Sequence, residues 1–92
     1  MNEYLFKPSN HLTFETVQTD SRRLLKLLHK QRNLTGIRFD LAQVEHCDST
    51  GLALLIEAKR LCKQRKINFV MENMSESLCG LAEFCGVDTV LT

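Results

Sequence analysis

The sequence predicts a small α/β sandwich, with a mixed, mostly parallel sheet of four to five strands and helices mainly on one face. Short apolar stretches that alternate with polar residues, typical of strands with one covered face, are separated by longer stretches of helical periodicity. Strands that are separated by helices are joined by right-handed crossovers, which makes them parallel. The length of 92 residues suits a single domain over residues 1–92.

The first third of the chain predicts two strands and a helix. Apolar stretches at residues 4–6 and 11–14 flank the turn-forming sequence KPSN, which predicts an opening β-hairpin. The helix that follows is capped by one of three polar residues, Thr19, Asp20 or Ser21. Its apolar stripe consists of three leucines at helical spacing, Leu24, Leu25 and Leu28.

The rest of the chain alternates between strand and helix. Residues 37–41 and 67–72 have the period of strands, and residues 50–66 have the period of a helix. A third helix begins after Ser75 or Ser77, and Gly86 stands where a left-handed residue closes a helix. Its apolar positions are Leu78, Leu81, Ala82 and Cys85. Residues 87–91 predict a last short strand.

The sequence HCDSTGLALL, residues 46–55, places an acid, two hydroxyls and a glycine where an apolar helix begins. Three interpretations compete: a helix cap, a catalytic nucleophile, or a surface that another protein binds and a kinase modifies. Asp48 or Ser49 can accept hydrogen bonds from the first helical turn. Gly51 allows another group to approach the backbone closely.

The second helix has apolar residues on two sides. At about 100° per residue, one arc is predicted to face the core; its members are Leu54, Leu55, Ala58, Leu61 and Cys62. Leu52 and Ile56 point away from that arc, on the same side as Ser49. Either another helix covers them or they form a protein-binding patch. A phosphate on Ser49 would suit the helix N-terminus yet change such a patch.

Composition and spacing argue against several other functions. The net charge is only +1, from 12 basic and 11 acidic residues, so nucleic acid is not an expected partner. The longest apolar run, residues 52–56, is too short for membrane insertion, and no signal peptide is evident, so a cytoplasmic location is expected. No metal or cofactor is predicted, because the cysteines lack metal-ligand spacing and instead suit small buried hydrophobes. They are Cys47, Cys62, Cys79 and Cys85.

Catalysis also has little support in the sequence. The residues DSTGL lack the glycine-serine elbow of serine hydrolases. No evident orienting partner accompanies any of the three histidines, His11, His29 and His46. No catalytic residue is therefore assigned, although an activity that depends on Cys47 or Ser49 remains an alternative.

At DSTGLALL the sequence resembles a STAS domain, the fold of anti-sigma-factor antagonists and of cytoplasmic domains of sulfate transporters. Residues 37–91 match in order: a strand, Asp-Ser-Thr-Gly, an amphipathic helix, a strand, and a short helix that ends in Gly-Val-Asp. In antagonists the hydroxyl residue after the aspartate is phosphorylated, which implies Ser49 here. The family's Gly-Glu-Leu-Asp-like segment is replaced by FETVQTD, residues 14–20.

Within the family, the GLALL run, the basic helix end KRLCKQRK and the LA…VL tail resemble MlaB-like proteins of Gram-negative bacteria. That resemblance implies a non-enzymatic accessory subunit that binds the MlaF-like ATPase of an ABC transporter for phospholipids. Its location would be peripheral to the inner membrane, through its partner. The implied partner-binding residues are Asp48, Ser49, Thr50, Gly51, Leu52 and Ile56. The alternative is an anti-sigma-factor antagonist that binds an anti-sigma kinase and is switched by phosphorylation of Ser49.

Overall fold

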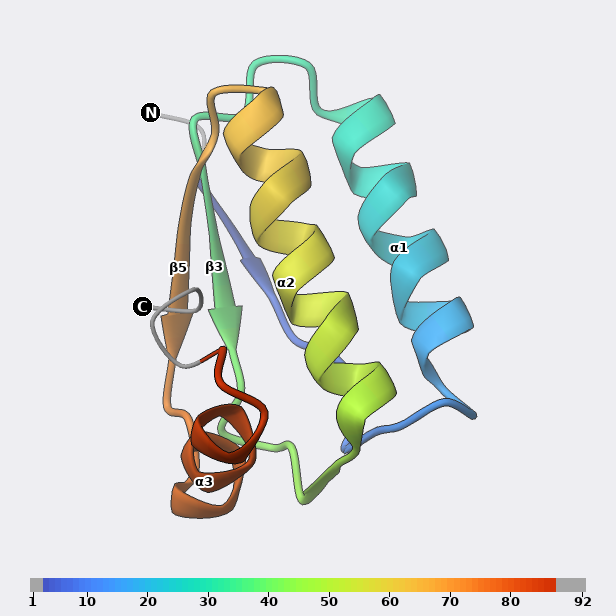
Figure 1. Cartoon of the computed structure of the whole chain (residues 1–92). Coiled ribbons are helices and arrows are strands. Elements are labelled where there is room, and N and C mark those ends of the chain that lie inside the picture. The colour runs from blue at the N-terminus through green and yellow to red at the C-terminus, as the bar shows by residue number, and fades with distance from the viewer. Residues whose placement is uncertain (1–2, 88–92) are drawn as a thin grey trace.

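The computed structural model describes residues 3–87, in which strands and helices alternate (Figure 1). The strands are β1 (Glu3–Phe6), β2 (His11–Leu12), β3 (Gly36–Asp40), β4 (His46–Cys47) and β5 (Asn68–Glu72). The helices are α1 (Val17–Lys30), α2 (Ser49–Gln64) and α3 (Glu76–Phe84). Most of the expected last strand, at residues 87–91, lies outside the described residues.

The five strands of residues 3–87 form two parallel sheets. The main sheet has the order β1-β3-β5, and its register places Phe6 beside Phe39 and Phe39 beside Met71. The small sheet pairs β2 with β4, and places His11 beside His46. The predicted α/β class with parallel strands is confirmed, with the strands divided between two sheets instead of joined in one.

The predicted opening hairpin is wrong. β1 pairs in parallel with β3, and β2 pairs in parallel with β4, so the two strands belong to different sheets. The connection KPSN carries the chain from one sheet to the other instead of reversing it. Pro8 is buried there, and the backbone N–H of Ser9 donates to Asp20 of α1 at 3.1 Å. Contacts with α1 thus replace the cross-strand contacts of a hairpin.

Helices α1 and α2 lie side by side on one face of the main sheet, and α3 lies at the end where β3 and β5 finish (Figure 1). The alternation predicted for residues 37–41 is confirmed, because Ile37, Phe39 and Leu41 are buried. On the same strand, Arg38 is exposed and pairs with Glu72 of β5 at 2.9 Å. In the described part of the chain, no helix is long and apolar enough to cross a membrane.

The buried side of α2 differs from the predicted arc. The residues that are fully buried are Gly51, Leu52, Leu55, Ala58 and Cys62. Leu54 and Leu61 are only partly buried, whereas Leu52, expected on the solvent face, is 2% exposed. The reason is that α1, β5 and both strands of the small sheet all contact α2, and therefore cover it from more than one side.

The ends of the other helices also correct some details. Helix α1 begins at Val17, earlier than predicted, so Asp20 lies within the helix and does not cap it. Leu25, expected in the core stripe, is 38% exposed. In α3 the predicted cap is confirmed: the Ser75 hydroxyl accepts a hydrogen bond from the N–H of Leu78 at 3.1 Å. Gly86 has the expected positive φ, +72°.

Two of the four cysteines are not the buried hydrophobes that were expected. Cys62 is buried and Cys47 is partly buried, but Cys79 and Cys85 are exposed. Helix α3 has only nine residues and buries Leu78 and Ala82. Its contact with the core is therefore too narrow to include Cys85 one turn later.

Candidate functional site

Asp48 fixes the start of α2 to the loop that follows β2. One carboxylate oxygen accepts a hydrogen bond from the N–H of Gly51 at 2.9 Å, and the other accepts from the N–H of Phe14 at 3.1 Å. The N–H of Asp48 itself donates to the carbonyl of Leu12 at 3.2 Å. The helix-cap interpretation is therefore confirmed, and the capping residue is Asp48.

These contacts also set the charge state of the cap. The hydrogen bond from the Gly51 N–H is the main cause that lowers the pKa of the Asp48 carboxyl below its ordinary value, and the bond from Phe14 acts in the same direction. Asp48 is therefore an anion at neutral pH. Its negative charge lies at the N-terminus of α2, where the helix dipole stabilises it.

Gly51 is required by a close approach of two backbones. A Cβ atom at this position would lie 1.9 Å from the carbonyl oxygen of Leu12 and 2.7 Å from its carbonyl carbon. No side chain fits in that space unless β2 moves away from α2. The predicted close approach is present, and the group that approaches is the chain's own strand β2.

The first residues of α2 and the loop residue Phe14 are exposed. Ser49 and Thr50 are the first two residues of α2, and both are exposed. Phe14 is 70% exposed, and its backbone is bound to Asp48. We call Phe14, Ser49 and Thr50 the α2-start surface. It combines two hydroxyls with an exposed aromatic ring, and aromatic residues are common at the centres of protein interfaces.

Phe14 was missed by the sequence reasoning, which placed it in the wrong hairpin. It lies 34 positions before Asp48 in the chain, so no local pattern connects the two residues. Only the parallel pairing of β2 with β4 brings the loop that carries Phe14 to the start of α2.

The six predicted partner-binding residues differ in how much of each is exposed. Ser49 and Thr50 are exposed, and Asp48 and Ile56 are partly exposed. Gly51 and Leu52 are buried beneath the helix start. The expectation that Leu52 lies on the solvent face is therefore wrong, and Leu52 belongs to the hydrophobic core.

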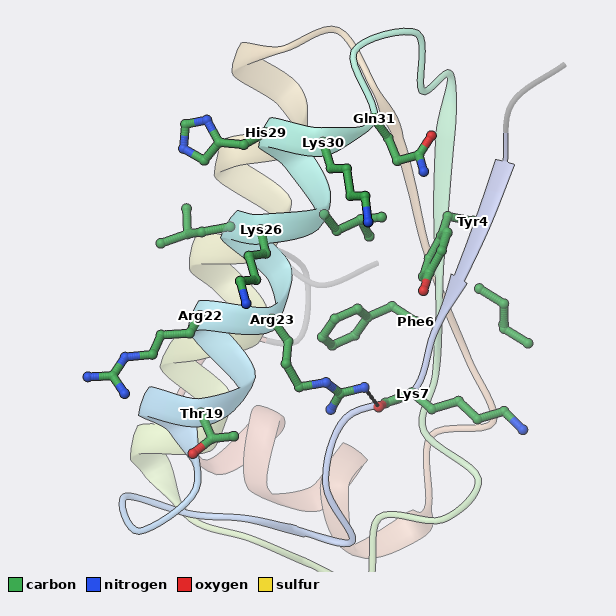
Figure 2. Close-up of a pocket in the computed structure, with 13 residues that line it drawn as sticks. Tyr4, Phe6, Lys7, Thr19, Arg22, Arg23, Lys26, His29, Lys30 and Gln31 are labelled. Atoms are coloured by element: carbon green, nitrogen blue, oxygen red, sulfur yellow. Dashed lines mark hydrogen bonds between the residues drawn. The ribbon is translucent and has the colours of Figure 1, made fainter.

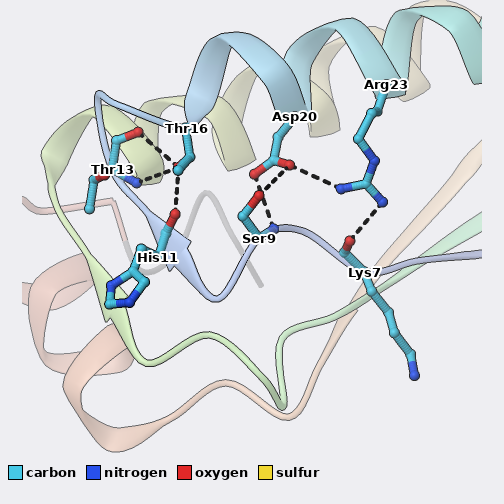
Figure 3. A network of polar contacts seen from close by, with 7 residues as sticks. All are labelled: Lys7, Ser9, His11, Thr13, Thr16, Asp20 and Arg23. Atoms are coloured by element: carbon cyan, nitrogen blue, oxygen red, sulfur yellow. Dashed lines mark hydrogen bonds and ion pairs between the residues drawn. The ribbon is translucent and has the colours of Figure 1, made fainter.

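The loop that carries Phe14 is held by a polar network of its own (Figure 3). The hydroxyl of Thr16 donates to the carbonyl of His11 and accepts from the N–H of Thr13 at 3.1 Å. One turn later, the buried carboxylate of Asp20 accepts from the hydroxyl of Ser9 at 2.9 Å. Residues 14–20 thus form an ordered corner that positions the α2-start surface.

The surroundings of Cys47 do not activate its thiol as a nucleophile. Burial raises the pKa of the Cys47 thiol to about 11, so the thiol remains protonated at neutral pH. His11 and His46 stack on each other, with ring centroids 5.0 Å apart. Among the described residues, no group of three or more His, Cys, Asp or Glu side chains could hold a metal ion.

Comparison with known proteins gives a family and two relatives. A family model described as "Mlab, STAS domain" matches residues 9–92. Anti-sigma-B factor antagonists of Listeria monocytogenes and Listeria innocua are each 33% identical to this chain over 55 residues. Those residues are 60% of this chain and 48% of each relative, so the chain spans about half the length of the curated relatives it matches.

Proposed function

Because this chain belongs to the STAS domain family, we propose that it is a non-enzymatic regulatory module whose α2-start surface binds a partner protein. The observation that carries the proposal is the position of Ser49. Its hydroxyl is exposed directly after Asp48, while Asp48 and Gly51 are fixed against β2 and the following loop. These contacts hold the backbone on both sides of Ser49 in one conformation, so less conformational entropy is lost when a partner binds.

The proposed regulation is phosphorylation of Ser49. A kinase partner would transfer the terminal phosphoryl group of ATP to the Ser49 oxygen, releasing ADP while the hydroxyl proton passes to the kinase's base. The phosphate would be tolerated by the first turn of α2. It would also add nearly two negative charges beside Phe14 and the anionic Asp48, and so weaken an apolar contact there.

The names of the two relatives support an antagonist function of this kind. If the chain is such an antagonist, its partner is an anti-sigma kinase. The unmodified chain binds this kinase, and the phosphorylated chain dissociates from it. The exposure of Ser49 agrees with this role, since a kinase must reach the hydroxyl.

A second candidate partner is supported by the description of the matching family model. In this second proposal, the partner of the α2-start surface is the MlaF-like ATPase of an ABC transporter for phospholipids. The complex lies at the inner membrane of a Gram-negative bacterium. Binding would stabilise one conformation or assembly state of the ATPase by the difference in affinity between states.

Purification of the chain from its native cells distinguishes the two candidates. Mass spectrometry of the stoichiometric partner, together with the phosphate content of Ser49, is the measurement. A small kinase together with phosphate on Ser49 in some growth state would establish the antagonist function. An ABC ATPase with its permease would establish the transporter function. A partner that is retained in full by both Phe14→Ala and Ser49→Glu would contradict the proposed surface.

A further inference from the structure

A second surface lies on β1 and α1, and it shares no residue with the α2-start surface. Here a groove of about 1170 Å³ runs between the strand and the helix (Figure 2). Tyr4 and Phe6 of β1 and Leu27 of α1 give it an apolar lining. Tyr4 is 44% exposed, whereas Phe6 is buried. A ligand in the groove would therefore cover the ring of Tyr4.

The helix side of the groove is positively charged. Arg22, Lys26 and Lys30 follow one another at a spacing of one turn of α1, and all three are exposed. None of them forms an ion pair within residues 3–87. No aspartate or glutamate is among the described residues that line the groove. Because the whole chain has a net charge of only +1, this is a local excess of positive charge.

Arg23 has a structural role at the lower end of the groove. Its guanidinium pairs with the buried Asp20 at 3.0 Å and lies 4.8 Å from the centre of the Phe6 ring. It also donates to the carbonyl of Lys7 at 3.0 Å. Arg23 therefore joins β1 to α1, whereas Lys26 and Lys30 remain available to an anionic ligand.

The strand side of the groove offers backbone groups. β1 is at the edge of the main sheet and, in the described part of the chain, pairs only with β3. The N–H and C=O groups on its outer edge can therefore pair with another extended chain. Addition of a strand to an open sheet edge is a common way for proteins to bind peptides.

We propose that this groove binds an acidic, extended segment of a partner protein, which adds a strand to β1. Its backbone would pair with the open edge, its apolar side chains would cover Tyr4, and its carboxylates would face Lys26 and Lys30. Nucleic acid and anionic lipid could satisfy the positive charges, but neither has the peptide groups that continue a sheet. This site does not depend on the α2-start surface, since it uses β1 and α1.

The test is fluorescence anisotropy with a labelled synthetic peptide of ten residues in which pairs of glutamates alternate with pairs of valines or tyrosines, so that each face of the extended peptide carries both kinds of side chain. We expect saturable binding that weakens as salt is added, because salt screens exposed charges. The double variant Lys26→Glu/Lys30→Glu should bind at least ten-fold more weakly. The matched control Lys63→Glu/Arg65→Glu makes the same charge change at the end of α2 and should bind as the unchanged protein does. Circular dichroism verifies that both variants are folded.

Two further probes separate strand addition from attraction of charge alone. A peptide of the same sequence with N-methylated backbone should lose binding, because it keeps its charges but lacks N–H donors. Equal binding of the methylated peptide would overturn the proposal, and so would no saturable binding of the acidic peptide. Tighter binding to vesicles of phosphatidylglycerol and phosphatidylcholine, lost in Lys26→Glu/Lys30→Glu, would overturn it in favour of a membrane surface.

Discussion

The starts of α1 and α2 each contain an aspartate, but the two residues are used differently. Asp20 is fully buried, and its carboxylate is bound by Ser9 and Arg23 (Figure 3). Asp48 is only partly buried and binds backbone N–H groups, while the side chains of the next two residues are exposed. At α1 the side chains of Ser9 and Arg23 are engaged in contacts within the fold. At α2 the contacts within the fold are made by Asp48 and backbone N–H groups, so the side chains of Ser49 and Thr50 remain exposed.

The largest effect on this arrangement should come from Gly51→Ala. The added methyl group would overlap the carbonyl of Leu12, so β2 must move, and we expect a loss of about 3 kcal/mol in the free energy of unfolding. Gly80→Ala in α3 is the matched control. Its methyl group meets nothing within 4 Å, and the change should gain up to about 1 kcal/mol. Urea denaturation measures both, and equal effects would contradict the role assigned to Gly51.

A smaller loss is expected from Asp20→Asn. The amide keeps the size of the carboxylate but turns one acceptor into a donor, which would face either the backbone N–H of Ser9 or the Ser9 hydroxyl together with Arg23. Buried groups left without a partner cost about 2 kcal/mol. The free energy of unfolding in urea is the measurement. A loss below about 0.5 kcal/mol, the size typical of surface changes, would show that the network is not structural.

The cap at Asp48 should be visible in the pH dependence of stability. Its pKa is lowered in the folded chain, so its contribution is complete above the ordinary pKa and is lost as the pH falls through the lowered value. Asp48→Asn removes this titration. The difference in unfolding free energy between the unchanged protein and the variant should therefore shrink as the medium is acidified. A difference that is independent of pH would contradict ionic capping.

The smallest effect on stability is expected at Ser49. Ser49→Ala and Ser49→Glu change an exposed side chain, and each should alter the free energy of unfolding by no more than about 0.5 kcal/mol. The glutamate would add a charge at the helix N-terminus, where it is tolerated. Thermal unfolding of the two variants measures this. A large loss in either one would mean that Ser49 also supports the fold.

The sequence predicted the elements better than their arrangement. Strands with alternating residues, such as 37–41, and helices with local caps, such as Ser75, depend on neighbours in the chain and were predicted correctly. The hairpin was wrong because the partners of β1 and β2 are distant strands. Leu52 was misplaced for a related reason, since a helical projection assumes one covered side and α2 is covered on several.

In the candidate site, too, local features could be predicted from the sequence and long-range contacts could not. The cap, the glycine and the exposed serine of DSTG could be predicted, because their roles follow from the chemistry of a helix start. Phe14 could not be predicted, because its contact with Asp48 depends on the pairing of the small sheet. The groove beside β1 was also missed, since an open sheet edge becomes visible only once the strand order is known.

Binding of a partner by the α2-start surface is tested by titrating the purified native partner into Ser49→Glu in a calorimeter. The matched control is Gln64→Glu, which adds the same charge at the far end of the same helix. We expect Ser49→Glu to bind at least ten-fold more weakly than the unchanged protein, and Gln64→Glu to bind as well as the unchanged protein. Equal affinity of Ser49→Glu and the unchanged protein would contradict binding through this surface.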